Sequence, residues 1–267
     1  MKFSLKGLLA AVAAAAVLTG CGEQAVDNSK IKVGVMAGAE AQVAEVAAKV
    51  AKEQYGLDVE LVTFTDYVTP NAALDDKSID VNAFQHKPYL DQQVTDRGYK
   101  LTIAGNTFVY PIAGYSKQVT SVEQIEDGAR IAVPNDPTNL GRSLILLEQQ
   151  GLVKLRENVG LLATVRDIVE NPKNITIVEL DAAQLPRSLD DVALSIINTT
   201  YASSINLTPE KDGVFVEDKE SPYVNLIVSR EENLNAENVQ NFVKAYQTDE
   251  VYQAAKTIFQ GGVVKGW

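Results

Sequence analysis

A strand–helix–strand pattern near the N-terminus constrains the fold more than any other feature of this sequence. Residues 31–36 alternate in polarity, as a half-buried strand does, and residues 59–64 read as a second strand. The helix between them has an apolar face with the spacing i, i+3, i+4 and i+7, and Gly56 is suited to end it. The residues of that face are Val43, Val46, Ala47 and Val50. Two strands joined by a helix predict a parallel α/β sheet.

A second α/β unit begins near residue 130. Residues 130–134 predict a strand, and the helix that follows has Leu144 and Leu147 on its apolar side and ends at Gly151. Further predicted strands span 175–180, 192–197 and 223–228, and two amphipathic helices span 237–246 and 249–259. The pattern predicts two α/β lobes whose strand ends face a shared cleft, the place where ligands of such sheets bind.

The connections between the two lobes are predicted near residues 110–114 and 198–201. The last predicted strand is expected to return to the first lobe, which would make that lobe discontinuous. Residues 31–110 and 202–267 are therefore assigned to lobe 1, and residues 111–201 to lobe 2.

The first twenty residues have the pattern of an export signal. Lys2 and Lys6 precede an uncharged run over residues 8–18, which is too short to span a bilayer permanently. The run ends in Leu-Thr-Gly before Cys21, which is typical of a bacterial lipidation site. The sequence therefore predicts a signal peptide at 1–20, lipidation of Cys21 and a tether over 21–30. An unmodified buried cysteine is the alternative.

Composition excludes several classes of protein. The formal charge is −11, and removal of Lys2 and Lys6 with the signal changes it to −13, which argues against nucleic acid as a partner. Cys21 is the only cysteine and His86 the only histidine, so neither a disulfide nor a multi-histidine metal site is available. No nucleophile elbow, zinc-protease motif or phosphate-binding loop is present. We expect a protein that is not an enzyme and needs no cofactor.

Aromatic residues follow several predicted strands at the end where a cleft would lie. These residues are Tyr67, Phe84, His86, Tyr89, Phe108 and Tyr110. Such a cluster can form an apolar slot for a ligand side chain. Ordinary core packing is the alternative.

Three polar residues are candidates for binding the charged groups of a small ligand. Arg142 lies near the start of a predicted helix and could hold a carboxylate through parallel hydrogen bonds. Asn198 follows one apolar strand and Asn225 lies within another, where an amide is costly unless it is hydrogen-bonded. The alternatives are a surface arginine and two structural amides.

Long segments of the chain resemble the NlpA lipoprotein family. The similar segments are 80–90, 105–115, 133–143, 184–190 and 198–202. The resemblance runs from the lipidation motif to Gly266 and Trp267. It implies a two-lobed periplasmic-binding-protein fold of the type II kind that binds methionine, L- and possibly D-, between its lobes. It also implies delivery of methionine to the permease of an ABC importer, and through it to the ATPase.

The resemblance assigns roles to seven of the candidate residues. Arg142 is expected to bind the ligand carboxylate, and Asn198 and Asn225 its polar backbone groups. The expected lining of the side-chain pocket is Tyr67, His86, Tyr89 and Phe108. The protein is expected to be a monomer on the periplasmic side of the cell envelope, anchored to the membrane through Cys21.

Three other functions are compatible with the pattern. The same fold could bind another amino acid or a methionine-containing dipeptide. A surface lipoprotein with an adhesion role would keep its function without the cleft residues. An enzyme would need a titratable pair in the cleft, and His86 alone does not supply one.

Overall fold

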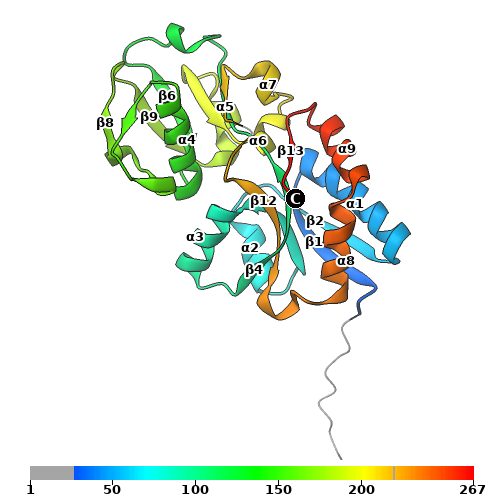
Figure 1. The fold of residues 1–267 in the computed structure, drawn as a ribbon. Coiled ribbons are helices and arrows are strands. Elements are labelled where there is room, and N and C mark those ends of the chain that lie inside the picture. Colours follow the sequence, from blue (N-terminus) through cyan, green and yellow to red (C-terminus); the bar gives the residue numbers. More distant parts are fainter. Residues whose placement is uncertain (1–26, 219) are drawn as a thin grey trace, which may run out of the picture.

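The computed structural model describes residues 27–218 and 220–267, which form two lobes, each built on a β-sheet with helices packed against it (Figure 1). The predicted signal peptide at 1–20, the lipidation site Cys21 and most of the tether at 21–30 lie outside the described residues.

The first lobe contains a six-stranded mixed sheet in the order β13-β4-β12-β3-β1-β2. Its strands are β1 (Lys30–Met36), β2 (Asp58–Phe64), β3 (Val81–His86), β4 (Leu101–Val109), β12 (Val224–Arg230) and β13 (Val264–Lys265). Strand β1 pairs in parallel with β2 and β3, whereas β12 is antiparallel to both β3 and β4. The helices of this lobe are α1 (Ala39–Tyr55), α2 (Thr69–Asp75), α3 (Lys87–Arg97), α8 (Glu237–Tyr246) and α9 (Asp249–Ile258).

The second lobe contains a five-stranded sheet in the order β11-β5-β10-β6-β9. Its strands are β5 (Ala113–Tyr115), β6 (Arg130–Pro134), β9 (Thr176–Leu180), β10 (Leu194–Ile197) and β11 (Phe215–Val216). A separate pair is formed by β7 (Lys154–Leu155) and β8 (Ile168–Glu170). The remaining α-helices are α4 (Pro137–Gln149), α5 (Leu185–Ser188), α6 (Thr199–Ser203) and α7 (Pro209–Asp212).

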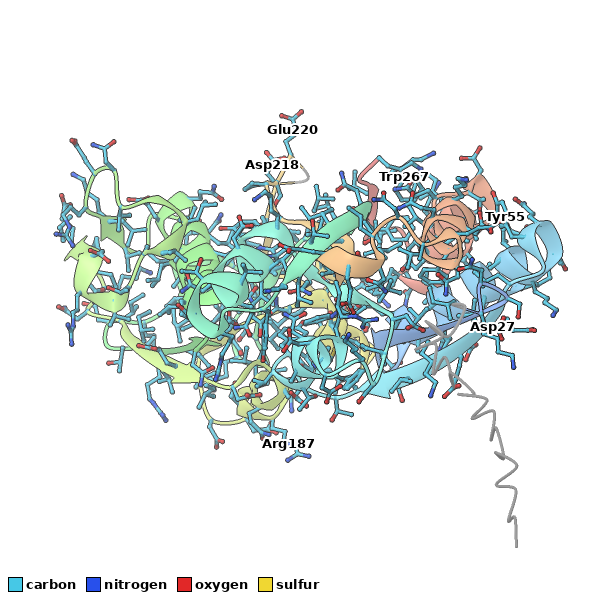
Figure 2. The ribbon with its side chains drawn as sticks, turned by 90° about the horizontal axis from the view of Figure 1, so that it is seen from below. Asp27, Tyr55, Arg187, Asp218, Glu220 and Trp267 are labelled. Carbon is cyan, nitrogen blue, oxygen red and sulfur yellow. The ribbon has the colours of Figure 1, made fainter. Side chains whose placement is uncertain are left out.

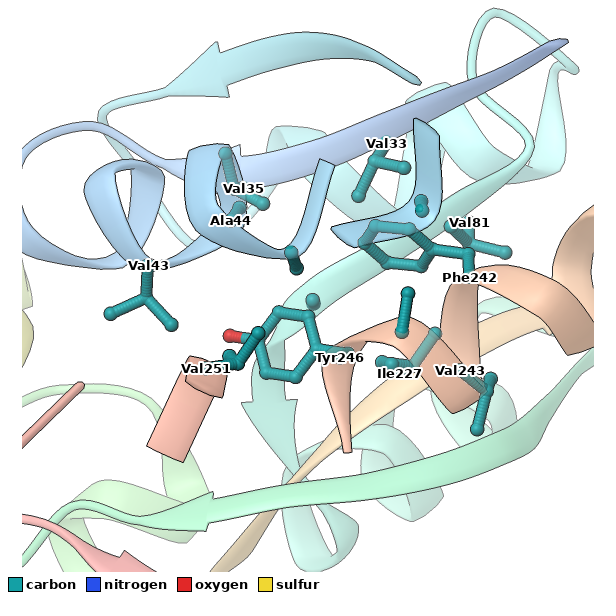
Figure 3. Close-up of a cluster of buried hydrophobic side chains, with 14 of the residues drawn as sticks. Val33, Val35, Val43, Ala44, Val81, Ile227, Phe242, Val243, Tyr246 and Val251 are labelled. Carbon is teal, nitrogen blue, oxygen red and sulfur yellow. The ribbon is translucent and has the colours of Figure 1, made fainter. Parts of the chain in front are cut away.

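Helix α1 packs with α8 and α9 over one face of the first sheet and forms the largest core cluster (Figure 3). Val43 and Ala44 of α1 meet Phe242 and Tyr246 of α8 in this core, and all four side chains are buried. Helix α1 ends at Gly56, whose φ of 65° lies in the left-handed region that favours glycine. The apolar face and the helix end predicted from the sequence are thus both confirmed.

The chain passes from the first sheet to the second between β4 and β5, at residues 110–112. The return passage differs from the expectation. After β10 the chain forms α6 and α7, and then β11 pairs with β5 of the second sheet. The return to the first sheet therefore lies between β11 and β12. Residues 215–216, which were assigned to lobe 1, belong to the second sheet.

In the part of the chain that the structure describes, no helix has both the length and the apolar character needed to cross a bilayer.

Candidate functional site

A cavity lies where the two lobes meet, and it contains about 360 Å³ of space, including the part open to solvent at its mouth. Residues from both lobes and from the connecting segments line it. They are Tyr67, Phe84, His86, Tyr89, Tyr110, Asn139, Arg142, Asn198, Thr199, Thr200 and Asn225. The cavity lies beyond the carboxyl ends of β3, β6 and β10, as expected for a ligand site in α/β lobes.

One wall of the cavity is aromatic. The rings of Tyr67, Phe84 and Tyr89 lie within 5.9 to 6.3 Å of one another, measured between centroids, and Tyr201 lies 5.0 Å from Tyr67. The Tyr89 hydroxyl donates to the backbone oxygen of Tyr67 (2.8 Å), which fixes the Tyr89 side chain against the segment that carries Tyr67. This wall is apolar and suited to an uncharged ligand side chain.

His86 ends β3 and caps the N-terminus of α3. Its Nδ1 accepts a hydrogen bond from the backbone N–H of Tyr89 (3.2 Å), so Nε2 carries the proton and donates to Asn139 Oδ1 (3.3 Å). Burial, together with the positive charge of Arg142, lowers the pKa of His86 to about 3. The ring is therefore neutral at physiological pH, and it connects the first lobe to α4 of the second.

Asn139 holds the polar side of the cavity together. Its Oδ1 accepts from Asn198 Nδ2 (2.9 Å) as well as from His86, and its Nδ2 donates to Asp136 Oδ2 (2.9 Å). Asn198 Oδ1 is buried and has no hydrogen-bond partner among the described residues. A buried acceptor without a partner is costly, and at this position it can receive a hydrogen bond from a ligand.

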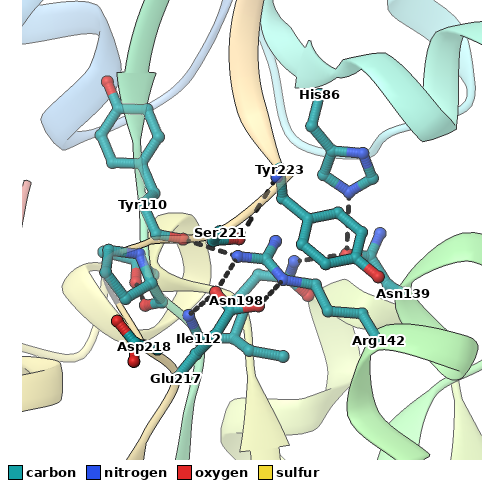
Figure 4. A network of polar contacts seen from close by, with 12 residues as sticks. His86, Tyr110, Ile112, Asn139, Arg142, Asn198, Glu217, Asp218, Ser221 and Tyr223 are labelled. Atoms are coloured by element: carbon teal, nitrogen blue, oxygen red, sulfur yellow. Dashed lines mark hydrogen bonds and ion pairs between the residues drawn. The ribbon is translucent and has the colours of Figure 1, made fainter. Parts of the chain in front are cut away.

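Arg142 lies in the second turn of α4, and only 3% of its side chain is exposed. Its Nε donates to Glu217 Oε1 (2.8 Å), and its Nη2 donates to Glu217 Oε2 (2.5 Å) and to the backbone oxygen of Tyr110 (3.0 Å). The guanidinium lies over the ring of Tyr223, 4.3 Å from its centroid (Figure 4). Arginine has five N–H donors, two of them on Nη1. The hydrogen bonds of Arg142 to other described residues use Nε and Nη2, which leaves the two donors of Nη1 for a ligand.

Two further residues connect the cavity wall to its surroundings. Asn225 Nδ2 donates to the backbone oxygen of Phe84 (3.1 Å) across the β12–β3 pairing. Thr200 donates through Oγ1 to Glu40 (2.5 Å), which lies fully buried in the first turn of α1. Burial raises the pKa of Glu40 to about 8, so this carboxyl is protonated at neutral pH.

The structure places six of the seven expected ligand residues around the cavity: Tyr67, His86, Tyr89, Arg142, Asn198 and Asn225. Phe108 is placed elsewhere. Its fully buried ring lies in the core of lobe 1, between 5.1 and 6.2 Å from the rings of Tyr246, Tyr252 and Trp267. Successive side chains of a strand point to opposite faces of the sheet. The side chain of Phe108 in β4 points to the face that α8 and α9 cover.

Sequence reasoning missed some of the lining residues. Asn139 was not among the predicted site residues; it lies in the first turn of α4, whose cap Asp136 accepts from the backbone N–H of Asn139 (2.9 Å). Thr199 and Thr200 directly follow Asn198 at the end of β10, and this position at a strand end was the available signal. Phe84 and Tyr110 were noted in the aromatic cluster, and both line the cavity.

The arrangement of the described residues supports neither metal binding nor acid–base catalysis. Among residues 27–218 and 220–267, no group of three or more histidine, cysteine, aspartate or glutamate side chains could hold a metal ion. His86 lies in the cavity wall, and each of its ring nitrogens already has a hydrogen-bond partner, Tyr89 at Nδ1 and Asn139 at Nε2. The wall presents hydrogen-bonding groups and aromatic rings, which suits binding.

A family model described as NlpA lipoprotein matches residues 31–267. The chain belongs to the NlpA lipoprotein family. It is 82% identical to the probable D-methionine-binding lipoprotein MetQ of Vibrio cholerae, and the match covers all of both chains. The family predicted from the sequence motifs is thereby confirmed.

Solved structures of this fold include ligand-bound and transport proteins. A nutrient-binding protein from Burkholderia cenocepacia bound to methionine is 50% identical, with a TM-score of 0.87 over 89% of this chain and 100% of that one. An ABC-transporter periplasmic substrate-binding protein from Coxiella burnetii is 48% identical, with a TM-score of 0.86 over 88% of this chain and 100% of that one. The NlpA-family chain thus has the predicted two-lobed fold of periplasmic binding proteins.

Proposed function

We propose that this NlpA-family lipoprotein binds methionine between its lobes and delivers it to the permease of an ABC importer. One observation carries the proposal: the interlobe cavity combines an arginine with two available donors, a buried amide oxygen without a partner and an aromatic wall. These three features match the carboxylate, the ammonium and the thioether side chain of methionine. The names of the relatives, which include methionine-binding proteins, support the same ligand.

The polar groups of the ligand have complementary partners in the cavity. The carboxylate accepts hydrogen bonds from Nη1 of Arg142, which lies in a nearly dry environment where charge-assisted bonds are strong. The ammonium donates to Oδ1 of Asn198, whose amide is already oriented by its bond to Asn139. Asn225 lies at the opposite side of the same cavity and completes the recognition of the amino-acid backbone.

The thioether side chain packs against the wall formed by Tyr67, Phe84 and Tyr89. Contacts between sulfur and aromatic rings contribute about 0.3–1.5 kcal/mol each. His86 adds an uncharged ring beside this wall, so a flexible apolar side chain meets no buried charge there.

The lobes close on the ligand by movement about the two connections at residues 110–112 and 217–223. We propose these two connections as the limits of lobe 2, in place of the limit at residue 201 predicted from the sequence. The closed form would be what the permease recognises, and its ATPase would then power transport. Lipid attached to Cys21 would hold the protein, as a monomer, at the periplasmic side of the membrane. Only a short segment separates Cys21 from β1 in the sequence, so the first lobe would stay close to the membrane.

Calorimetry with L- and D-methionine tests the ligand assignment. The measurement uses a soluble version of the protein that starts after Cys21. This protein is unfolded and refolded beforehand, which removes any ligand retained through purification. We expect tight binding of one methionine per chain, with alanine and leucine much weaker. If folded protein gives no heat with either enantiomer, methionine is excluded, and other amino acids and dipeptides are to be screened.

A further inference from the structure

Glu217 is a largely buried acid that the recognition of methionine described above does not use. It follows β11, at the start of the return connection to lobe 1, and only 10% of its side chain is exposed. Its Oε2 accepts from Arg142 Nη2 and, more weakly, from the backbone N–H of Ile112 in the other connection (3.4 Å). Glu217 therefore links Arg142 to both connections between the lobes (Figure 4).

Glu217 lies on the side of Arg142 away from the cavity. Arg142 lines the cavity, whereas Glu217 does not. Glu217 instead lines a separate groove, together with Leu161, Pro222 and Tyr223, on the other side of the guanidinium. The carboxylate thus occupies the Nε–Nη2 edge of the arginine and leaves Nη1 for a ligand, so Glu217 and a ligand carboxylate do not compete for the same donors.

The charges around the cavity sum to zero when Glu217 is included. Arg142 carries the positive charge and Glu217 the negative one, while neutral His86 and protonated Glu40 add none at neutral pH. Asp136 does not line the cavity; it lies at the N-terminus of α4, where the helix dipole and the hydrogen bonds from Thr138 and Asn139 stabilise its charge. In a site that excludes water, a ligand with a net charge would remain uncompensated, which is unfavourable.

From this geometry we propose that Glu217 determines the charge selectivity of the site, so that it accepts zwitterions and rejects ligands carrying a net charge. The proposal rests on the methionine-binding function proposed above. Glu217 acts through Arg142: it neutralises the guanidinium and orients its free edge toward the ligand carboxylate. Without Glu217, a buried, uncompensated Arg142 would favour an anion.

Three ligands of nearly the same shape test this selectivity. Methionine is a zwitterion, its α-hydroxy analogue is an anion, and methioninamide is a cation. Their affinities are measured by calorimetry in the wild-type protein, in Glu217→Gln and in Asp218→Asn. Asp218 follows Glu217 in the chain and is exposed at the surface (Figure 2), so its substitution removes the same formal charge and leaves the Arg142–Glu217 ion pair in place.

We expect the wild-type protein to bind methionine more tightly than either charged analogue. In Glu217→Gln the ratio of methionine affinity to hydroxy-analogue affinity should fall by about tenfold or more, because the site then carries a positive charge. Asp218→Asn should leave the ratio unchanged. Glu217→Asp keeps the charge and should keep the ratio within about threefold, although all three ligands bind less tightly.

The ratio separates selectivity from a merely structural role, which would weaken all three ligands by the same factor. An unchanged ratio in Glu217→Gln would overturn the proposal. If this variant is unfolded alone, the hydroxy analogue should refold it at lower concentration than methionine does, because ligand binding stabilises the folded state. Failure of both ligands to refold it would also count against the proposal. Failure of the wild-type protein to bind methionine would instead refute the proposed function.

Discussion

At the scale of single residues, the site depends on which polar atoms remain without a partner. Asn198 and Asn233 each have a buried side-chain oxygen that receives no hydrogen bond among the described residues. Only Asn198 lines the interlobe cavity, while Asn233 donates to the backbone of Asp80 in lobe 1. The same unpaired amide oxygen is therefore a candidate ligand contact at Asn198 and not at Asn233, because only Asn198 faces the cavity.

Asn198→Ala should weaken methionine binding by about 10- to 100-fold, since a hydrogen bond to a charged group contributes about 1.5–3 kcal/mol. Asn139 Oδ1 keeps its bond from His86 in this variant, so the loss of stability should be small. Calorimetry and thermal unfolding check the two expectations. Asn233→Ala is the matched control and should leave methionine affinity unchanged. Equal effects of the two substitutions would remove Asn198 from the ligand site.

Phe108 and Tyr67 test the placement of the aromatic residues. Phe108→Leu should lower the free energy of unfolding by about 1–3 kcal/mol, because it leaves space between α8, α9 and Trp267, with methionine affinity retained. Tyr67→Leu should instead reduce methionine affinity, since its ring lies in the cavity wall. Urea unfolding and calorimetry on both variants distinguish core from pocket. A reversed pattern would return Phe108 to the ligand site.

Residue types at strand ends predicted several of the residues that line the cavity, because parallel strands bring their carboxyl ends to one edge. Tyr67, His86 and Asn198 were found in this way. Glu217 was not, since it is 75 residues from Arg142 in sequence and follows a strand of two residues. Phe108 was misplaced because the face of a strand to which a residue points depends on the register with its neighbours, which sequence alone does not reveal.

At the scale of elements, the periodic helices and strands were predictable and the irregular connections were not. Helix α8 begins and ends where its apolar period predicted, and β6 matches its predicted range. The return to lobe 1 was misplaced because β11 is too short to produce a recognisable alternation. Short elements gain their stability from partners distant in sequence, here β5, so no local pattern marks them.

Helix α4, which carries Asn139 and Arg142, is positioned by a close approach at Gly141. A Cβ atom at this glycine would lie 2.1 Å from the backbone oxygen of Leu161. Gly141→Ala should therefore destabilise the protein, although alanine favours helix by about 1 kcal/mol over glycine. We expect a net loss of about 2 kcal/mol or more in urea unfolding, together with weaker methionine binding.

Gln149→Ala provides the comparison for Gly141→Ala. Gln149 is exposed at the end of the same helix, so its substitution should change the free energy of unfolding by no more than about 0.5 kcal/mol. A Gly141→Ala variant as stable as Gln149→Ala would show that the segment around Leu161 moves away without cost, and that its contact does not position α4.

At the scale of the whole molecule, two buried titratable groups make stability depend on pH in opposite directions. His86 has a pKa of about 3 in the folded protein, against 6.5 when exposed. The unfolded chain therefore binds a proton that the folded one does not, and stability falls as pH decreases below 6.5. Glu40 has a pKa of about 8 in the folded protein, against 4.5 when exposed, so stability falls as pH rises from 4.5 to 8.

Glu40 dominates the window between pH 6.5 and 8, because folded His86 is neutral throughout it and the exposed imidazole is at most half protonated. Over this range the unfolded chain has lost the Glu40 proton and the folded protein still holds it, which lowers stability by up to about 1.4 kcal/mol per pH unit. Glu40→Gln keeps a neutral partner for Thr200 and removes the titration. Its free energy of unfolding should therefore fall less between pH 6.5 and 8, by about 2 kcal/mol.

Urea unfolding at both pH values measures this difference, and Glu45→Gln is the control. Glu45 is exposed on the same helix, so its substitution makes the same change of side chain at the surface and leaves the buried carboxyl in place. The wild-type protein and Glu45→Gln should lose stability together as pH rises, while Glu40→Gln should remain nearly level. Parallel curves for all three proteins would mean that Glu40 ionises in the folded state near its ordinary pKa, with water reaching the start of α1 beside the cavity. Methionine affinity would then fall as pH decreases through about 4.5, because ionised Glu40, next to Thr200 of the cavity wall, would attract the ammonium group only above that pH.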